Sequence, residues 1–271
     1  MSATRFAPSP TGLLHRGHAF SALTAFETAC AMGGRFVLRI EDIDFTRCRQ
    51  AFEVAIYEDL AWLGLDWERP VLRQSERLAD YLAALDALVA RGLAYRSFKT
   101  RREVELAMLS APHGPGEGYR GEPPAPAEEA ARLAAGEPFA WRLNLAAAER
   151  EAGPLSFEDA DRGRVPVDAS AAGDVVLARK DVGVAYHLAV VVDDARQGIT
   201  EVVRGADLFE ATHVQRLLQA LLGLPEPRYR HHRLIVGPDG QRLAKRTGAQ
   251  TLQALRASGV TAAQLRAELG F

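Results

Sequence analysis

The residues best suited to chemistry lie in a turn near the start of the chain. His15 and His18 flank Gly17, directly after the segment Pro-Ser-Pro-Thr-Gly at 8–12. Imidazoles at a helix N-terminus can donate to phosphate oxygens, and the helix dipole adds partial positive charge there. Two histidines in a turn are usually only polar loop residues, but the preceding segment favours an ATP-phosphate site. Gly17 would let the adenine moiety approach the backbone closely.

A second basic segment lies near the other end of the chain. Lys245 and Arg246 follow a Pro-Asp-Gly turn at 238–240, and only three lysines occur in the whole sequence. A lysine there can stabilise the charge that develops on the β- and γ-phosphates of ATP. A solvated basic turn is the alternative. Paired with the histidine turn, the segment predicts that a carboxylate attacks the α-phosphate, giving an acyl-adenylate and pyrophosphate.

Four further residues form a candidate pocket for a small acid. Glu41 ends an apolar β run, and active-site residues of parallel sheets gather at such strand ends. A carboxylate there can bind an α-ammonium group, while Arg5 and Arg204 can hold carboxylates through paired hydrogen bonds. Tyr186 completes the set. Taken singly, each residue could equally be a surface charge or part of a structural salt bridge.

The elements that must position these residues fit an α/β fold. A strand ending at 5–7, a helix over 18–32 and a strand over 35–40 form a unit typical of a Rossmann-type, doubly wound parallel sheet. Further helices are expected at 52–63, 75–90, 208–222 and 250–271, and further strands at 139–144, 175–179, 188–192, 202–207 and 232–236.

The chain is expected to divide into two catalytic halves around an insertion. We assign 1–94 and 186–249 to the catalytic domain, 95–185 to an inserted α+β region, and 250–271 to a helical tail. Within the insertion, residues 110–140 are rich in Pro, Gly, Ala and Glu and are interpreted as a flexible surface segment.

The composition is that of an ordinary globular protein. Of 271 residues, 48% are hydrophobic and 25% charged, and the net charge is −2. This balance gives no whole-molecule attraction to nucleic acid, although a local basic face is possible. The two cysteines form no metal or redox motif. We expect a cytoplasmic protein with no signal peptide and no membrane span, and nothing demands more than a monomer.

Five segments in the right order resemble the glutamyl-tRNA synthetase family of class I enzymes. They comprise the sequences RFAPSPTG at 5–12, LRIEDID at 38–44, DLAWLGLD at 59–66, VRGADL at 203–208 and RLAKR at 242–246. The resemblance implies a Rossmann catalytic domain with an inserted acceptor-binding-like region. Ala244 departs from the family's usual Lys-Met-Ser-Lys-Ser pattern, in which a serine stands at that position.

The resemblance also implies roles for individual residues. Glu41 would hold the α-ammonium of glutamate, and ATP would be bound by His15, Gly17, His18, Lys245 and Arg246, with Mg²⁺ shielding its phosphates. The remaining glutamate contacts would come from Arg5, Ala7, Ser9, Tyr186 and Arg204.

The length of the chain points to a short branch of this family. Full glutamyl-tRNA synthetases continue with helical anticodon-binding domains, whereas about 25 residues follow Arg246 here. The short branch activates glutamate without tRNA and transfers it to the queuosine base at the wobble position of tRNA(Asp). Its partners would be L-glutamate, ATP and the anticodon stem-loop, for which Arg96, Lys99, Arg101 and Arg102 are candidate contacts.

One departure from the family concerns zinc. Many members bind zinc in the insertion through a Cys-x-Cys pair, a tyrosine and a later cysteine. Here Ser97, Lys99 and Pro123 stand in place of the cysteines, beside Tyr119. Zinc needs thiolate or imidazole donors in tetrahedral geometry. We therefore expect no metal and an insertion held by packing alone.

Three alternatives stay open. A truncated glutamyl-tRNA synthetase would charge the 3′ end of tRNA(Glu) instead. A small-molecule ligase resembling pantothenate synthetase would also use a His-x-Gly-His turn, but it leaves the segments at 38–44 and 203–208 unexplained. A catalytically silent tRNA-binding module would have no need of His15, His18 and Lys245.

Overall fold

The computed structural model describes residues 1–110, 118–179, 183–235 and 250–271. Its strands are β1 (Ala3–Phe6), β2 (Arg35–Ile40), β3 (Glu68–Arg73), β4 (Ala94–Ser97), β5 (Ala140–Leu143), β6 (Ser156–Asp159), β7 (Gly163–Pro166), β8 (Val176–Arg179), β9 (Gly183–Val184), β10 (Glu201–Gly205) and β11 (Arg228–His232). Its α-helices are α1 (Arg16–Ala31), α2 (Gln50–Trp62), α3 (Leu78–Ala90), α4 (Arg101–Ser110), α5 (Pro126–Ala134), α6 (Leu145–Ala152), α7 (Tyr186–Arg196), α8 (Phe209–Leu221), α9 (Leu252–Ala257) and α10 (Ala262–Leu269).

Two sheets meet in the centre of the catalytic part. One has the parallel order β1-β2-β3, and the other runs β10-β11-β6-β7 with only β7 antiparallel. Their edges meet where Thr200 donates its backbone N–H to the carbonyl of Ala3 (3.0 Å), just before β10. This arrangement confirms the expected α/β fold with a parallel sheet. Ligand sites of such sheets lie at the carboxyl ends of strands on either side of the switch point.

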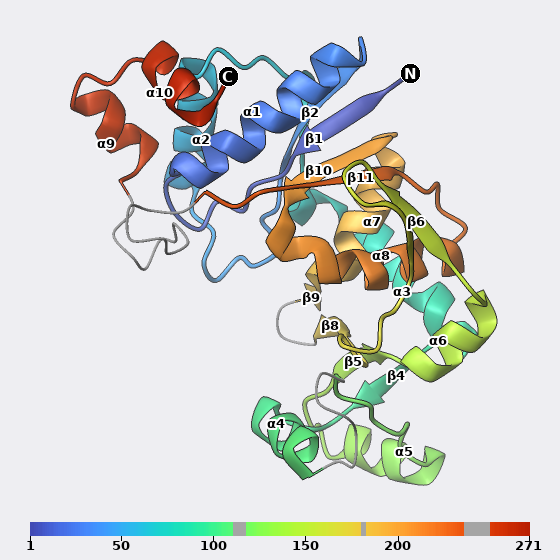
Figure 1. Ribbon diagram of the computed structural model, residues 1–271. Coiled ribbons are helices and arrows are strands. Elements are labelled where there is room, and N and C mark those ends of the chain that lie inside the picture. The colour runs from blue at the N-terminus through green and yellow to red at the C-terminus, as the bar shows by residue number, and fades with distance from the viewer. Residues whose placement is uncertain (111–117, 180–182, 236–249) are drawn as a thin grey trace.

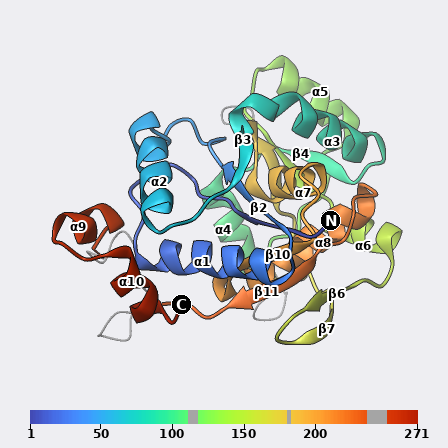
Figure 2. The same ribbon diagram turned by 90° about the horizontal axis from the view of Figure 1, so that it is seen from above.

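Helix α1 covers the sheet close to that switch point (Figures 1 and 2). Its inner face is built largely from alanines, including the fully buried Ala19, Ala22 and Ala25. Small side chains allow a helix to approach a sheet closely, and burial of the neighbouring Leu23 supplies apolar area. The close packing fixes the N-terminus of α1, where the histidine turn lies.

The inserted region forms its own antiparallel sheet, β4-β5-β8-β9, at the far end of the molecule from α1 (Figure 1). Its centre is the buried carboxylate of Asp174. That carboxylate accepts from the Tyr95 hydroxyl (2.8 Å) and from the backbone N–H groups of Gly121 (2.8 Å) and Leu145 (3.0 Å). The expectation that packing alone holds the insertion is therefore wrong, because one carboxylate joins three of its segments.

Part of the expected insertion belongs to the catalytic sheet instead. The β6–β7 hairpin falls within 95–185, yet β6 pairs in parallel with β11 through Tyr229 and Asp159. The segment expected to be flexible, 110–140, contains the helix α5, although no residue of that helix is buried. Its start has Pro126 and the acidic pair Glu128 and Glu129, which favour a helix N-terminus.

Two element predictions are wrong. Residues 188–192 form the middle of helix α7 rather than a strand, with Leu188, Val190 and Val191 at most 2% exposed. A short run that is apolar on all sides suits a buried helix as well as a buried strand, so periodicity cannot separate the two. The strand expected at 232–236 instead ends at His232. Its inward residues are polar, Tyr229 and His231, and hydrophobic pattern alone does not mark them.

The tail is helical, as expected, but it is divided into the two helices α9 and α10, which pack against α1 and α2 (Figure 2). Thr251 caps α9 and pairs with His15 in an isolated bridge, while the backbone N–H of Leu252 donates to Leu14. A salt bridge joins Arg16 to Glu268 at 2.8 Å. The last helix thus braces the turn that carries the two histidines.

Candidate active site

A cavity of about 690 Å³ lies at the carboxyl ends of β1, β2 and β10. Its volume suits a nucleotide or a comparable ligand. The structure brings every described residue of the expected site to this cavity: Arg5, Ala7, Ser9, His15, Gly17, His18, Glu41, Tyr186 and Arg204. The expected phosphate-binding residues Lys245 and Arg246, and the departure at Ala244, lie outside the described residues.

The two histidines form a reciprocal cap on α1. The backbone N–H of Gly17 donates to Nδ1 of His15 (3.1 Å), and the backbone N–H of His15 donates to Nδ1 of His18 (3.1 Å). Because each Nδ1 is an acceptor, a neutral ring has its proton on Nε2. The rings lie together, with centroids 3.8 Å apart. The cap therefore orients two Nε2–H donors at a helix N-terminus, as an anion site requires.

Two glycines leave space for side chains that line the cavity. A Cβ at Gly17 would lie 3.0 Å from the His15 ring, so the missing side chain lets the imidazole fold back onto the helix. This reason differs from the expected close approach of a nucleotide to the backbone. A Cβ at Gly205 would lie 2.4 Å from Oδ1 of Asp207, which also lines the cavity.

One side of the cavity is built on a buried chain of charges. Asp194, on α7, accepts from Nε of Arg5 (3.1 Å) and from Nη1 of Arg39 (2.6 Å). Nη2 of Arg39 then donates to Glu41 at 3.1 Å. Arg39 is fully buried and also lies 3.7 Å from Asp193. The chain fixes the two expected glutamate contacts, Arg5 and Glu41, relative to each other.

Burial and this pairing together shift the pKa values of Asp194 and Glu41. Burial alone would raise the pKa of Asp194, but the neighbouring Arg5 and Arg39 outweigh it and hold that pKa below its usual value. For Glu41 burial wins, so its pKa is raised even though Arg39 opposes the shift. A cationic ligand beside Glu41 would favour its charged form.

On the other side of the cavity, neutral acceptors hold Arg204. Arg204 donates through Nη1 to Oε1 of Gln215 (2.7 Å), through Nη2 to Oγ1 of Thr212 (2.6 Å), and through Nε to Nε2 of His231 (3.3 Å). His231 in turn contacts Asp159, with 2.6 Å between Nδ1 and Oδ2. No carboxylate touches Arg204 in the part of the chain that the structure describes.

The histidine in this group stays neutral. Burial lowers the pKa of His231 to about 4, even though its bond to Asp159 works in the opposite direction. Burial also disfavours the charged form of Asp159, but the hydrogen bond from His231 and a backbone N–H keep that pKa below its usual value. Near neutral pH, the pair is therefore a carboxylate beside a neutral imidazole.

Sequence reasoning missed the residues behind the pocket. The partners of the two cavity arginines and of Glu41 are Arg39, Asp194, Thr212, Gln215 and His231, and Asp159 stands behind His231. One signal was available, because the adjacent acids Asp193 and Asp194 follow an apolar run. The polar alternation around Tyr229 and His231 was a second, weaker signal.

The positions that replace the zinc-binding cysteines form no donor set. Ser97 is buried, and Nζ of Lys99 lies 5.6 Å from the centroid of the Tyr119 ring. An ammonium and a hydroxyl do not fit a tetrahedral zinc site. No group of three or more His, Cys, Asp or Glu side chains suited to a metal occurs among the described residues. The absence of zinc stays a prediction.

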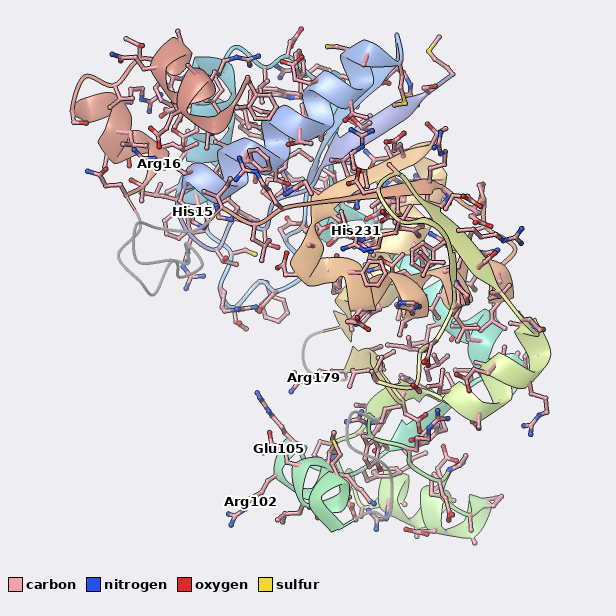
Figure 3. The ribbon with its side chains drawn as sticks, in the orientation of Figure 1. His15, Arg16, Arg102, Glu105, Arg179 and His231 are labelled. Atoms are coloured by element: carbon pink, nitrogen blue, oxygen red, sulfur yellow. The ribbon has the colours of Figure 1, made fainter. Side chains whose placement is uncertain are left out.

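Two of the basic residues considered for RNA contact are engaged within the protein. Arg96 pairs with Glu129 and lies over the Trp141 ring at 4.3 Å. Arg101 pairs with Glu105 on α4, from which Arg102 and Glu105 project at the end of the molecule opposite His15 (Figure 3).

None of the helices in the described ranges is long and apolar enough to cross a bilayer.

Comparisons with known proteins identify the family of this chain. Residues 2–269 match the family described as tRNA synthetases class I (E and Q), catalytic domain. A Rhodobacter capsulatus protein named Glutamyl-Q tRNA(Asp) synthetase is 48% identical over 99% of both chains. A Nocardia farcinica protein of the same name is 46% identical, over 98% of this chain and 83% of that one.

A solved structure supports the same assignment. The glutamate-tRNA synthetase of Elizabethkingia anophelis has a TM-score of 0.77 at 29% identity, over 91% of this chain and 53% of that one. The match therefore spans about half of a longer enzyme. Sequence and fold agree: this chain belongs to the class I aminoacyl-tRNA synthetases for glutamate and glutamine, as a ligase built on their catalytic domain.

Proposed function

We propose that this protein activates L-glutamate with ATP, without needing tRNA, and transfers it to the queuosine base at the wobble position of tRNA(Asp). The observation that carries the proposal is the match over 99% of both chains to a relative named Glutamyl-Q tRNA(Asp) synthetase. By contrast, a relative from Ruegeria pomeroyi named Glutamate--tRNA ligase 1 is covered over only 58% of its length.

The first step forms glutamyl-adenylate. A glutamate α-carboxylate oxygen attacks the α-phosphorus of ATP, and the bond to the β-phosphate oxygen breaks to release pyrophosphate. The Nε2 donors of His15 and His18, at the start of α1, suit the negative charge of the phosphates. We assign the leaving pyrophosphate to Lys245 and Arg246. A Mg²⁺ ion on the phosphates would shield their charge.

Charge complementarity supports the glutamate site. Glu41 is the carboxylate for the α-ammonium, and its raised pKa would fall towards the usual range beside that cation. Arg5, Tyr186 and Arg204 hold carboxylate oxygens, and the acceptors of Arg204 among the described residues are all neutral. Ala7 and Ser9 complete the wall of the cavity. The proposed contacts thus place Glu41 for the one cation of glutamate, and Arg5 and Arg204 for its two carboxylates.

The second step transfers the glutamyl group. A hydroxyl of the queuosine cyclopentene ring attacks the adenylate carbonyl carbon and releases its proton to water. The bond between that carbon and the phosphate oxygen breaks, and AMP leaves. The product is an ester on the base, and the protein forms no covalent intermediate. The partner is the anticodon stem-loop of tRNA(Asp), and we propose that a cytoplasmic monomer acts on it.

The test is glutamate-dependent exchange of pyrophosphate into ATP with no tRNA present. Robust exchange with glutamate, and none with glutamine or aspartate, is the expected result. A matched pair of variants, Lys245→Ala and Lys99→Ala, checks the role of the first lysine: exchange should fall by orders of magnitude only in the first. Exchange that appears only after tRNA is added would overturn the tRNA-independent step.

A truncated glutamyl-tRNA synthetase is the second candidate. It is favoured by the 42% identity to the Ruegeria pomeroyi ligase over 96% of this chain. Transfer of labelled glutamate separates the two. Queuosine-containing tRNA(Asp) should accept it, whereas the same tRNA without queuosine and tRNA(Glu) should not. Charging of tRNA(Glu) would establish the second candidate, and no exchange under any condition would favour a silent tRNA-binding module.

A further inference from the structure

We propose that Asp159 and His231 are positioning residues for Arg204: the carboxylate selects the imidazole tautomer whose Nε2 lone pair accepts the Arg204 Nε–H. The inference rests on the proposed function, because it concerns how the pocket orients a cation towards a glutamate carboxylate. It is carried by a buried line of hydrogen bonds that joins β6, β11 and β10. The proposed role is to orient Arg204, and it does not involve the adenylation chemistry itself.

The first link is the contact between the carboxylate and the imidazole. Both side chains are completely buried, with 2.6 Å between Oδ2 of Asp159 and Nδ1 of His231. The other oxygen, Oδ1, accepts the backbone N–H groups of Asp161 (3.0 Å) and Arg162 (3.1 Å). A turn therefore holds the carboxylate in place. An ionised carboxylate only accepts, so Nδ1 carries the proton and Nε2 has a lone pair.

The second link is the set of acceptors around the guanidinium. Nε2 of His231 lies 3.3 Å from Nε of Arg204 and 3.0 Å from Oγ1 of Thr212. That same hydroxyl accepts from Nη2 of Arg204, and Gln215 accepts from Nη1. Each of the three nitrogens of the guanidinium thus has a neutral acceptor. Figure 3 shows His231 in the centre of the catalytic part, well away from the exposed side chains of α4.

The choice of tautomer decides whether this arrangement holds. If the proton were on Nε2, two N–H groups would face each other across the 3.3 Å contact, and Arg204 would have to move. A carboxylate in place of His231 would hold the guanidinium but cancel its charge. A neutral imidazole with a fixed tautomer is the arrangement that orients Arg204 and leaves its charge for a ligand carboxylate.

The decisive variant is Asp159→Asn, with Asp161→Asn on the same turn as its matched control. An asparagine amide can donate to Nδ1 and so favours the wrong tautomer. In ATP–pyrophosphate exchange, we expect the KM for glutamate to rise by about tenfold or more in Asp159→Asn, with kcat and the KM for ATP nearly unchanged. Asp161→Asn should behave as the wild type. An unchanged glutamate KM in a folded Asp159→Asn protein would overturn the inference.

A spectroscopic readout tests the tautomer independently of activity. In protein with ¹⁵N-labelled histidine, the His231 signal should show a protonated Nδ1 and an unprotonated Nε2 in the wild type. That signal should change in Asp159→Asn but not in Asp161→Asn. A protonated Nε2 in the wild type would contradict the inference even if the protein had no exchange activity.

Substitution of the histidine supplies a second route if Asp159→Asn fails to fold. In His231→Gln, the amide oxygen can take the place of Nε2 as acceptor, so the glutamate KM should stay within about fivefold of the wild type. His231→Phe has no acceptor and should raise that KM by at least about tenfold. Equal KM values in the two variants would overturn the inference. A wild type without glutamate exchange would instead refute the proposed function.

Discussion

Arg5 and Arg204 line the same cavity and are almost equally buried, yet the protein holds them in opposite ways. They are 5% and 4% exposed. Arg5 donates to Asp194, a carboxylate that it shares with Arg39. Arg204 donates only to Thr212, Gln215 and His231 within the described structure.

The difference teaches how one pocket can combine stability with binding. A paired guanidinium has its charge largely compensated inside the protein and serves as part of the framework. A guanidinium with neutral acceptors keeps its charge, and burial of that charge costs free energy that a bound carboxylate can recover. We therefore expect the Asp194 side to set the stability of the fold and the Arg204 side to set the affinity for an acidic ligand.

The largest effect should come from removing the shared carboxylate. Asp194→Asn leaves Arg5 and Arg39 short of an anion in a buried place, so the free energy of unfolding should fall by roughly 3–5 kcal/mol. Urea denaturation followed by circular dichroism measures it. Asp80→Asn, which breaks the exposed pair with Arg196, is the control and should cost less than about 1 kcal/mol. Equal costs would contradict the framework role of Asp194.

The next test exchanges the two arginines for methionine. Arg5→Met leaves Asp194 with one cation fewer, whereas Arg204→Met leaves the neutral acceptors Thr212, Gln215 and His231 behind. We expect the first to lose about 2 kcal/mol more stability than the second. Arg204→Met should nevertheless raise the glutamate KM by roughly a hundredfold, because the cation proposed to hold a glutamate carboxylate is lost. If the two variants were equally unstable, the distinction between the two sides would fail.

The pH dependence of stability should differ between the sides. The folded pKa of His231, about 4, lies below its unfolded value of 6.5, so the unfolded state binds more protons between these limits. Stability from this residue is full above about pH 6.5 and lost as the pH falls towards about 4. Asp194 has a lowered pKa, so its contribution is lost only below the usual range of aspartate. Asp159, Arg204 and Arg162 are the charged groups that act on His231.

Thermal unfolding between pH 7 and pH 5 measures this contribution. Burial also lowers the pKa of other histidines, including His187, so the quantity that matters is the difference between the wild type and His231→Gln. The wild type should lose more stability than the variant over this interval. Parallel curves would mean that His231 is not held neutral by burial.

The smallest effect should come from Thr212. Thr212→Val keeps the shape of the side chain but removes the oxygen that accepts from Nη2 of Arg204, which should raise the glutamate KM by about fivefold. Thr212→Ser keeps the oxygen and serves as the control. A KM unchanged in the valine variant would show that the hydroxyl does not help to orient Arg204.

The residues that face the cavity were predictable because they lie in short segments with recognisable order. Arg5, Glu41 and Arg204 each stand within such a segment, and the structure brings all three to one cavity. The strand and helix around the histidine turn followed from hydrophobic pattern and from the glycines after the helix. The hydrophobic pattern and the glycines were sufficient for these elements, because neighbouring residues decide where each one begins and ends.

The partners behind the cavity were not predictable because they are distant in sequence. Asp194 meets Arg5 across 189 positions, and His231 meets Asp159 across 72. Asp194 also lies on α7, part of which was expected to be a strand, so the direction of its side chain could not be predicted. A polar residue gives no sign in the sequence of the distant group that it will contact. Hydrogen-bond partners of this kind appear only once the fold is known.

The C-terminal residue has a practical consequence for how the protein is handled. The Phe271 ring lies 5.5 Å from that of Phe20, which itself lines the cavity and contacts His232. At the other end, Met1 is 94% exposed. A bulky label attached at Phe271 would therefore lie one side chain away from the cavity wall. A label attached at Met1 would extend into solvent, and that position is the better choice for labelling or surface attachment.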